Sequence, residues 1–174
     1  RLHFSAKRTM KIAQNLYEAG HITYMRTDSS SVAEEALVAT RSLIESRYGK
    51  EYLPDGAVRY KTKSKGAQEA HEAIRPTDVA AEPDGIALES DAHTKLYRLI
   101  WQRLVASQMV PARLKSETIL IDADRCAAVF KATGTVVSFD GYLKVWPTAR
   151  EDTILPSVEP GQTLELQELV TDQH

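Results

Sequence analysis

The strongest periodic signal in the sequence is an apolar stripe at helical spacing across residues 91–109. Six side chains form this stripe: Leu96, Tyr97, Ile100, Trp101, Leu104 and Val105. Positions three and four apart share one face of an α-helix, so the stripe predicts a helix with one wide buried face. The helix is expected to end before Pro111, because proline has no N–H to donate and its ring clashes with the preceding turn. The chain must therefore contain a core against which this helix packs.

Two further helices are expected upstream of the stripe, and a glycine follows each of them. The first covers residues 5–19 and has Ser5 as its N-cap. The second covers residues 31–48, where Ser31 and Glu34 have the spacing of a capping box. The first part of the chain is therefore expected to be largely helical.

After Pro111 the spacing changes from helical to strand-like. Four short segments of strand composition are separated by turn signals: residues 113–122, 126–133, 135–146 and 163–170. Helices followed by strands are typical of the α+β class. We therefore predict an α+β fold with two domains, a largely helical domain in residues 1–110 and part of an antiparallel β domain in residues 111–174.

Composition and charge narrow the possible functions. No apolar run approaches the roughly 20 residues that cross a bilayer, and the first residues lack the pattern of a secretory signal, so we expect a cytoplasmic protein without a membrane partner. The single cysteine, Cys126, excludes a disulfide within the chain and a cysteine-based zinc site. The net charge is only −2, but residues 1–30 carry +3 and residues 140–174 carry −5. A phosphate-binding surface should therefore lie in the first half, although chance unevenness on solvated faces explains the charges equally well.

The first candidate site is a short segment, residues 21–26, whose β-branched and aromatic composition predicts a strand. In an extended chain Tyr24, Arg26 and Asp28 would project from one face. A phenol with a pKa of about 10 needs a base or a positive field before it can attack phosphorus. The guanidinium of Arg26 could supply that field and stabilise the charged phosphate oxygens.

Asp28 could orient Arg26 or take part in proton transfer. It is also expected to stand immediately before the second helix, whose N–H groups would favour an anion such as phosphate. From the spacing alone, commoner roles remain open: Tyr24 as a packing residue, Arg26 as a surface ion-pair partner and Asp28 as a helix cap.

The second candidate segment surrounds His71 and Arg75, which can both donate hydrogen bonds to phosphate oxygens. Pro76 restrains the preceding Arg75 to an extended conformation. A metal site is a weaker interpretation, because the spacing of Glu69, His71 and Glu72 does not match the helical His-Glu-x-x-His pattern. In the alternative without function, His71 caps a loop and Arg75 pairs with an acidic neighbour.

Both candidate segments resemble the signatures of one enzyme family, the bacterial type IA DNA topoisomerases. The active-site motif of that family is similar to GHITYMRTDS at residues 20–29, and its second signature is similar to AHEAIRPT at residues 70–77. Met25, where the topoisomerase III branch typically has proline, favours the topoisomerase I branch. Residues 96–109 and FDGY at residues 139–142 also resemble the family, so the resemblance runs through essentially the whole chain.

The resemblance implies a topoisomerase that relaxes negative supercoils by cleaving and rejoining one DNA strand. The strand would be held through a 5'-phosphotyrosyl bond, whose ester conserves the energy of the broken bond, so that ATP is not required. It implies four catalytic residues: Tyr24, Arg26, His71 and Asp28. It also implies two residues that support the site or bind the DNA strand, Thr23 and Arg75.

The resemblance also implies what lies outside this sequence. The full-length enzymes use magnesium, whose acidic ligands mostly precede this region, so we expect a central fragment that is inactive by itself and holds no metal. Its expected partners are DNA, mainly single-stranded, and the missing domains of the same polypeptide. Its expected location is the cytoplasm, in association with the nucleoid. The main alternative is a non-catalytic module of the same fold that binds single-stranded DNA, and a purely structural helical domain is a third possibility.

Overall fold

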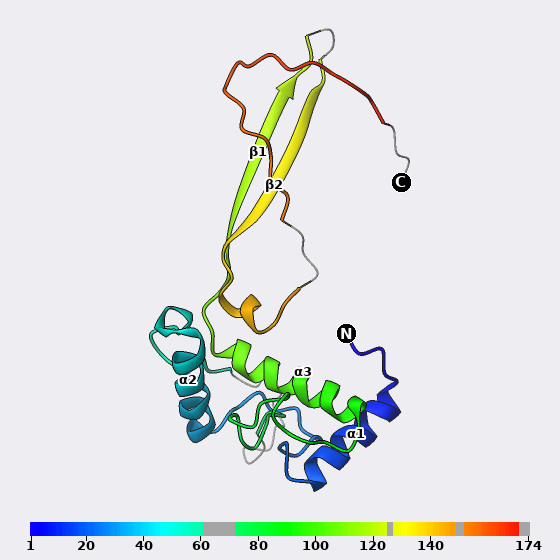
Figure 1. The fold of residues 1–174 in the computed structure, drawn as a ribbon, viewed down its shortest axis with the longest axis vertical. Coiled ribbons are helices and arrows are strands. Elements are labelled where there is room, and N and C mark those ends of the chain that lie inside the picture. Colours follow the sequence, from blue (N-terminus) through cyan, green and yellow to red (C-terminus); the bar gives the residue numbers. More distant parts are fainter. Residues whose placement is uncertain (61–71, 125–126, 149–151, 171–174) are drawn as a thin grey trace. The chain divides into compact units, whose positions relative to one another are not determined.

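The fold combines three α-helices with one two-stranded antiparallel sheet, which confirms the predicted α+β class (Figure 1). It is seen in a computed structural model that describes residues 1–60, 72–124, 127–148 and 152–170. The elements of regular structure are α1 (Ala6–Glu18), α2 (Glu34–Tyr48), the 3-10 helix η1 (Lys50–Tyr52), α3 (Asp91–Ser107), β1 (Arg113–Asp122), β2 (Val129–Phe139) and the 3-10 helix η2 (Gly141–Lys144). None of the helices in the described residues has both the length and the apolar character needed to cross a membrane.

The chain divides into two compact units. Unit 1 contains Arg1–Arg113 and Ser138–Arg150, and unit 2 contains Leu114–Val137 and Glu151–His174. Residues 138–150 group with the helices because Val145 is buried in the helical core. The division into domains at residue 110 stays a prediction. That prediction did not include the grouping of residues 138–150 with the helices.

Helix α1 forms as the sequence predicts. The Ser5 hydroxyl accepts a hydrogen bond from the Arg8 N–H, which satisfies one of the free donors of the first turn. Ile12, Ala13 and Leu16 form the buried face of the helix. Since α1 packs against α3, these residues contribute to one core.

Helix α2 ends near the predicted residue but does not begin as predicted. Its N-cap is Ala33, and no side chain caps it, so the capping box at Ser31 and Glu34 is wrong. Ser31 lies outside the helix because its carbonyl accepts a hydrogen bond of 2.7 Å from the N–H of Ala73. Glu34 instead pairs with Arg59.

Helix α3 is the centre of the core in unit 1, and it confirms the predicted stripe except that Ile100 is only partly buried. Two of its aromatic residues also hold the loop that follows the second candidate segment. The Tyr97 hydroxyl donates to the carbonyl of Ala81 at 2.7 Å, and the Trp101 indole donates to the carbonyl of Val79 at 2.8 Å. Burial raises the pKa of Tyr97 to about 12, so its hydroxyl stays protonated and can keep donating.

Unit 2 contains most of the hairpin formed by β1 and β2, and its strands differ from those predicted. Two strands were expected at residues 126–133 and 135–146, although residues 125–126 lie outside the described part. Instead β2 continues through Gly134, where a side chain would stand 2.6 Å from the carbonyl oxygen of Thr153. The glycine therefore permits a close approach of the backbone and does not end the strand.

The last expected strand, at residues 163–170, is also wrong. This segment has no regular structure and its side chains are exposed. The end of the segment expected at 135–146 forms η2 in unit 1. Strand composition alone does not form a strand, because the segment needs a partner with which to exchange hydrogen bonds.

Candidate active site

The end of α1 sets the path of the chain into the first candidate segment. The N–H of Gly20 bonds to the carbonyl of Tyr17 at 2.8 Å, and the N–H of His21 bonds to the carbonyl of Leu16 at 2.9 Å. This pair of bonds is the Schellman motif, which requires a left-handed residue, and Gly20 has φ +78°. Ile22 follows and is only 1% exposed, so the chain turns straight back into the core.

The strand expected at residues 21–26 is wrong, because it is reduced to one antiparallel bridge between Ile22 and Pro76. The bridge is flanked by two backbone hydrogen bonds. The Thr23 N–H donates to the carbonyl of Arg75 at 2.9 Å, and the Thr77 N–H donates to the carbonyl of His21 at 3.1 Å. The two candidate segments, far apart in the sequence, are therefore bonded directly to each other.

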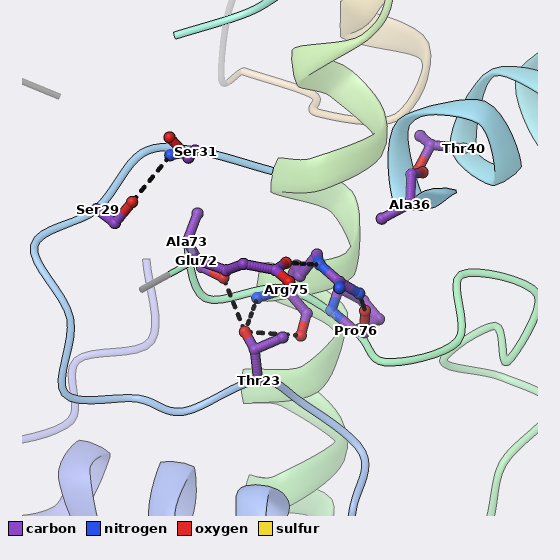
Figure 2. A network of polar contacts seen from close by, with 9 residues as sticks. All are labelled: Thr23, Ser29, Ser31, Ala36, Thr40, Glu72, Ala73, Arg75 and Pro76. Carbon is purple, nitrogen blue, oxygen red and sulfur yellow. Dashed lines mark hydrogen bonds and ion pairs between the residues drawn. The ribbon is translucent and has the colours of Figure 1, made fainter. Parts of the chain in front are cut away.

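The Thr23 hydroxyl strengthens this connection from the side chain. It donates to the carbonyl of Ala73 at 2.7 Å and accepts from the N–H of Arg75 at 2.9 Å (Figure 2). A threonine hydroxyl has one hydrogen to donate, and here that hydrogen is used inside the protein. This geometry favours the supporting role expected for Thr23, immediately before Tyr24, and contact of Thr23 with DNA stays a prediction.

The guanidinium of Arg75 is also held within the protein. Its Nε donates to the Glu72 carboxylate at 2.6 Å, its Nη1 donates to the carbonyl of Pro76 at 2.9 Å, and the side chain is only 13% exposed (Figure 2). The sequence left open that Arg75 pairs with an acidic neighbour, and Glu72 is that neighbour. Contact of Arg75 with DNA stays a prediction. Its side chain does bond to two other residues of the second segment, Glu72 and Pro76.

The carboxylate of Glu72 gives this pair a dependence on pH. The hydrogen bond from Arg75 lowers the pKa of Glu72, against a smaller opposing effect of burial. A carboxylate with a lowered pKa in the folded state stabilises the fold above its ordinary pKa, and this stabilisation is lost as the pH falls through the lowered value.

We therefore expect Glu72→Gln to lower the melting temperature at pH 7 by about 2 °C, since solvent screening limits such a pair to about 0.5–1 kcal/mol. The difference from wild type should shrink as the pH falls through the lowered pKa of Glu72, which thermal melts from neutral to acid pH would measure. Glu45→Gln is the matched control, because Glu45 is exposed and has no ion pair within the described part of the chain. A difference between wild type and Glu72→Gln that stayed constant as the pH was lowered would contradict the expectation.

Tyr24, Arg26 and Asp28 are all exposed. Tyr24 is 43% exposed, while Met25 beside it is 7% exposed and anchors the segment in the core together with Ile22. Neither the Arg26 nor the Asp28 side chain has a hydrogen bond or ion pair within the residues that the structure describes. Both are therefore accessible to a ligand, and their catalytic roles stay predictions.

The sequence predicts that Asp28 stands immediately before a helix, and this prediction is wrong. Helix α2 begins at Glu34. In the segment that precedes it, the N–H of Ser29 donates to the Thr27 hydroxyl and the N–H of Ser31 donates to the Ser29 hydroxyl. Asp28 therefore does not immediately precede the first turn of α2.

His71 and Glu69 lie outside the described residues, so the roles expected for His71 stay predictions. In the described ranges no three histidine, cysteine or acidic side chains are grouped so that they could hold a metal ion. One neighbour of Tyr24 was not anticipated from the sequence. The ring of Tyr17 contacts the ring of Tyr24 edge to face, with 5.2 Å between their centroids.

Comparison with known proteins assigns the chain to a family. The family model described as DNA topoisomerase matches residues 1–174, and the chain belongs to this family. Among its bacterial relatives it is 47% identical over 178 residues to DNA topoisomerase 1 of Salmonella typhimurium, and 46% identical over 184 residues to that of Campylobacter jejuni. These alignments cover 100% of the chain but only 20% and 26% of the two relatives, so the chain spans about a fifth to a quarter of their length.

A solved structure gives the same result. The full-length topoisomerase I from Thermotoga maritima is similar over 91% of this chain and 26% of its own, with a TM-score of 0.76 and 39% identity. The resemblance to topoisomerase I inferred from the two motifs is therefore confirmed.

Proposed function

We propose that the polypeptide carrying this chain cleaves and rejoins one DNA strand with Tyr24 as its nucleophile, and so relaxes negative supercoils without ATP. The observation that carries the proposal is the direct bonding of the two signature segments, which holds an exposed tyrosine between the buried residues Ile22 and Met25. A nucleophile needs such a fixed backbone and an open side, because the DNA must approach its oxygen in one direction.

The proposed reaction exchanges one phosphate ester for another. The phenol oxygen of Tyr24 bonds to phosphorus as the bond from phosphorus to the 3' oxygen breaks, and the phenol proton leaves while the 3' oxygen gains a proton. Attack by the 3'-hydroxyl reverses the step. The exposed guanidinium of Arg26 would stabilise the charge on the phosphate oxygens. Asp28 would assist the proton transfers, and His71 would contact the scissile region in concert with it.

We propose that the complete polypeptide uses magnesium, with ligands that lie mostly outside this chain. This fits the described residues, in which no three histidine, cysteine or acidic side chains are grouped so that they could hold a metal ion. The steps above are accordingly assigned to side chains of this chain alone. A cytoplasmic, nucleoid-associated location and cooperation with further domains of the same polypeptide belong to the same proposal.

Covalent trapping on a labelled single-stranded oligonucleotide tests the reaction. The complete polypeptide is incubated with DNA labelled at its 3' end or at its 5' end and is then denatured. A 5'-phosphotyrosyl bond should leave the 3' label on the protein and release the 5' label. Retention of the 5' label would reverse the proposed polarity. Binding without any attached label would favour the non-catalytic binding module.

The 174-residue chain itself should bind single-stranded DNA weakly and lose binding as salt is added. Residues 1–30 carry five exposed cations: Arg1, Lys7, Arg8, Lys11 and Arg26. If about three of them contact phosphates, affinity should fall about 20-fold between 50 and 200 mM salt. Titration of a labelled oligonucleotide at several salt concentrations measures this slope. The double variant Lys7→Gln and Lys11→Gln should make the slope shallower, whereas tight binding that is insensitive to salt would indicate base stacking instead.

A further inference from the structure

The edge-to-face contact between Tyr17 and Tyr24 joins the end of α1 to the proposed nucleophile. The ring centroids are 5.2 Å apart and the ring planes meet at 65°. This is a favourable geometry, because the positive edge of one ring faces the negative face of the other. Both side chains are largely exposed, at 41% and 43%, so the contact is made on the surface where DNA could reach it.

Tyr17 is held in place more firmly than its exposure suggests. It follows Leu16, which is 1% exposed, on a helix whose buried face is packed in the core. Its carbonyl accepts the N–H of Gly20 in the turn that ends the helix. The ring is therefore attached to a rigid helical backbone, and it lies against the exposed side chain of Tyr24.

Tyr24 needs such a support because its oxygen must stand in line with the bond that breaks. The first side-chain torsion of a tyrosine has three staggered positions. Only a position that points the oxygen at phosphorus can react, and time spent in the others lowers the rate in proportion.

We propose that Tyr17 is a positioning residue that holds the ring of Tyr24 in its reactive orientation. The inference rests on the proposed function of Tyr24. Tyr17 contributes its ring and not its hydroxyl, so phenylalanine can replace it. The same support acts in cleavage and in rejoining, because the phenol oxygen occupies the same place when it attacks and when it leaves.

The test compares four variants of the complete polypeptide in the rate of covalent attachment to single-stranded DNA. Tyr17→Ala should slow attachment about tenfold, which corresponds to about 1.4 kcal/mol in the barrier. Tyr17→Phe should stay within about twofold of wild type. Tyr17→Leu keeps an apolar side chain without an aromatic edge and should be as slow as alanine. Met10→Ala is the control, since Met10 lies on the same helix and is 40% exposed.

Three measurements separate positioning from a merely structural role. DNA affinity and the melting temperature should change no more in Tyr17→Ala than in Met10→Ala. In NMR spectra of the 174-residue chain, contacts between the ring protons of residues 17 and 24 should be present in wild type and in Tyr17→Phe. Equal rates for alanine, leucine and wild type would overturn the inference, as would a slow phenylalanine variant or a parallel loss of rate and affinity.

The failure of this inference can be told apart from the failure of the proposed function. If wild type attaches to DNA and the alanine variant does so at the same rate, only the role of Tyr17 is lost. If wild type never attaches, the proposed function is wrong. In that case the inference falls with it.

Discussion

Replacement of Tyr24 by phenylalanine is expected to abolish covalent attachment of DNA while leaving the fold and DNA affinity intact. The substitution removes the only atom that can attack phosphorus in the proposed reaction. Loss of a nucleophile commonly lowers catalysis by about 10⁴-fold or more, so no attached label should be detected. The effect on stability should be small, about 2 °C or less in melting temperature, because the ring and its contact with Tyr17 remain.

Tyr17→Phe is the matched control for this variant. It makes the same chemical change in the ring that contacts Tyr24, and attachment should persist. The measurement is the yield of protein that retains a 3' label after denaturation, together with the melting temperature of each protein. A normal yield from Tyr24→Phe would remove Tyr24 from the mechanism and transfer the reaction to another residue.

The parts of the fold that depend on neighbouring residues could be predicted from the sequence. Helix α1 lies between an N-cap at Ser5 and a left-handed turn at Gly20, and both signals act within a few residues. The stripe of α3 is equally local, because every member lies on one continuous face. The start and end of such a helix are set by residues near them in the sequence, and long-range contacts only select the face that becomes buried.

The parts that depend on distant backbone could not be predicted. Nothing near Ser31 indicates that its carbonyl accepts from the N–H of Ala73, and this bond keeps Ser31 out of α2. Likewise, the composition around Ile22 suggested a strand, but the N–H of Arg75 donates to the side-chain hydroxyl of Thr23 and not to a backbone carbonyl, so the pairing stops at one bridge. The sequence predicted a strand boundary at Gly134. The backbone of Thr153 lies close to this glycine, and residues near Gly134 in the sequence give no sign of that contact.

The candidate site shows the same division. The motif residues could be selected from the sequence, and the exposure of Tyr24 fits a residue that meets a ligand. The roles of their neighbours could not be predicted, because these roles depend on tertiary contacts. The neighbours concerned are the Thr23 hydroxyl, the Glu72 carboxylate and the Tyr17 ring. The fixed geometry around Tyr24 is thus made by residues whose sequence context is ordinary.

The Thr23 hydroxyl tests how far that geometry matters, and Thr23→Val is expected to weaken both the fold and the reaction. Valine has a similar shape but leaves the N–H of Arg75 and the carbonyl of Ala73 without the bonds of 2.9 and 2.7 Å that they make to Thr23. Leaving such partly buried groups unpaired should cost about 2 kcal/mol, or about 4–8 °C in melting temperature.

Covalent attachment should fall as well, because the lost bonds lie next to Tyr24 and join the two signature segments. We expect at least about a tenfold lower rate at a temperature where the variant is fully folded, which corresponds to about 1.4 kcal/mol in the barrier. Thr23→Ser keeps the hydroxyl and should retain most of both properties. Rates and melts of wild type, Thr23→Ser and Thr23→Val decide the matter, since the hydroxyl is irrelevant if serine and valine behave alike. A destabilised valine variant with a normal rate would show that Thr23 supports the fold without positioning the tyrosine beside it.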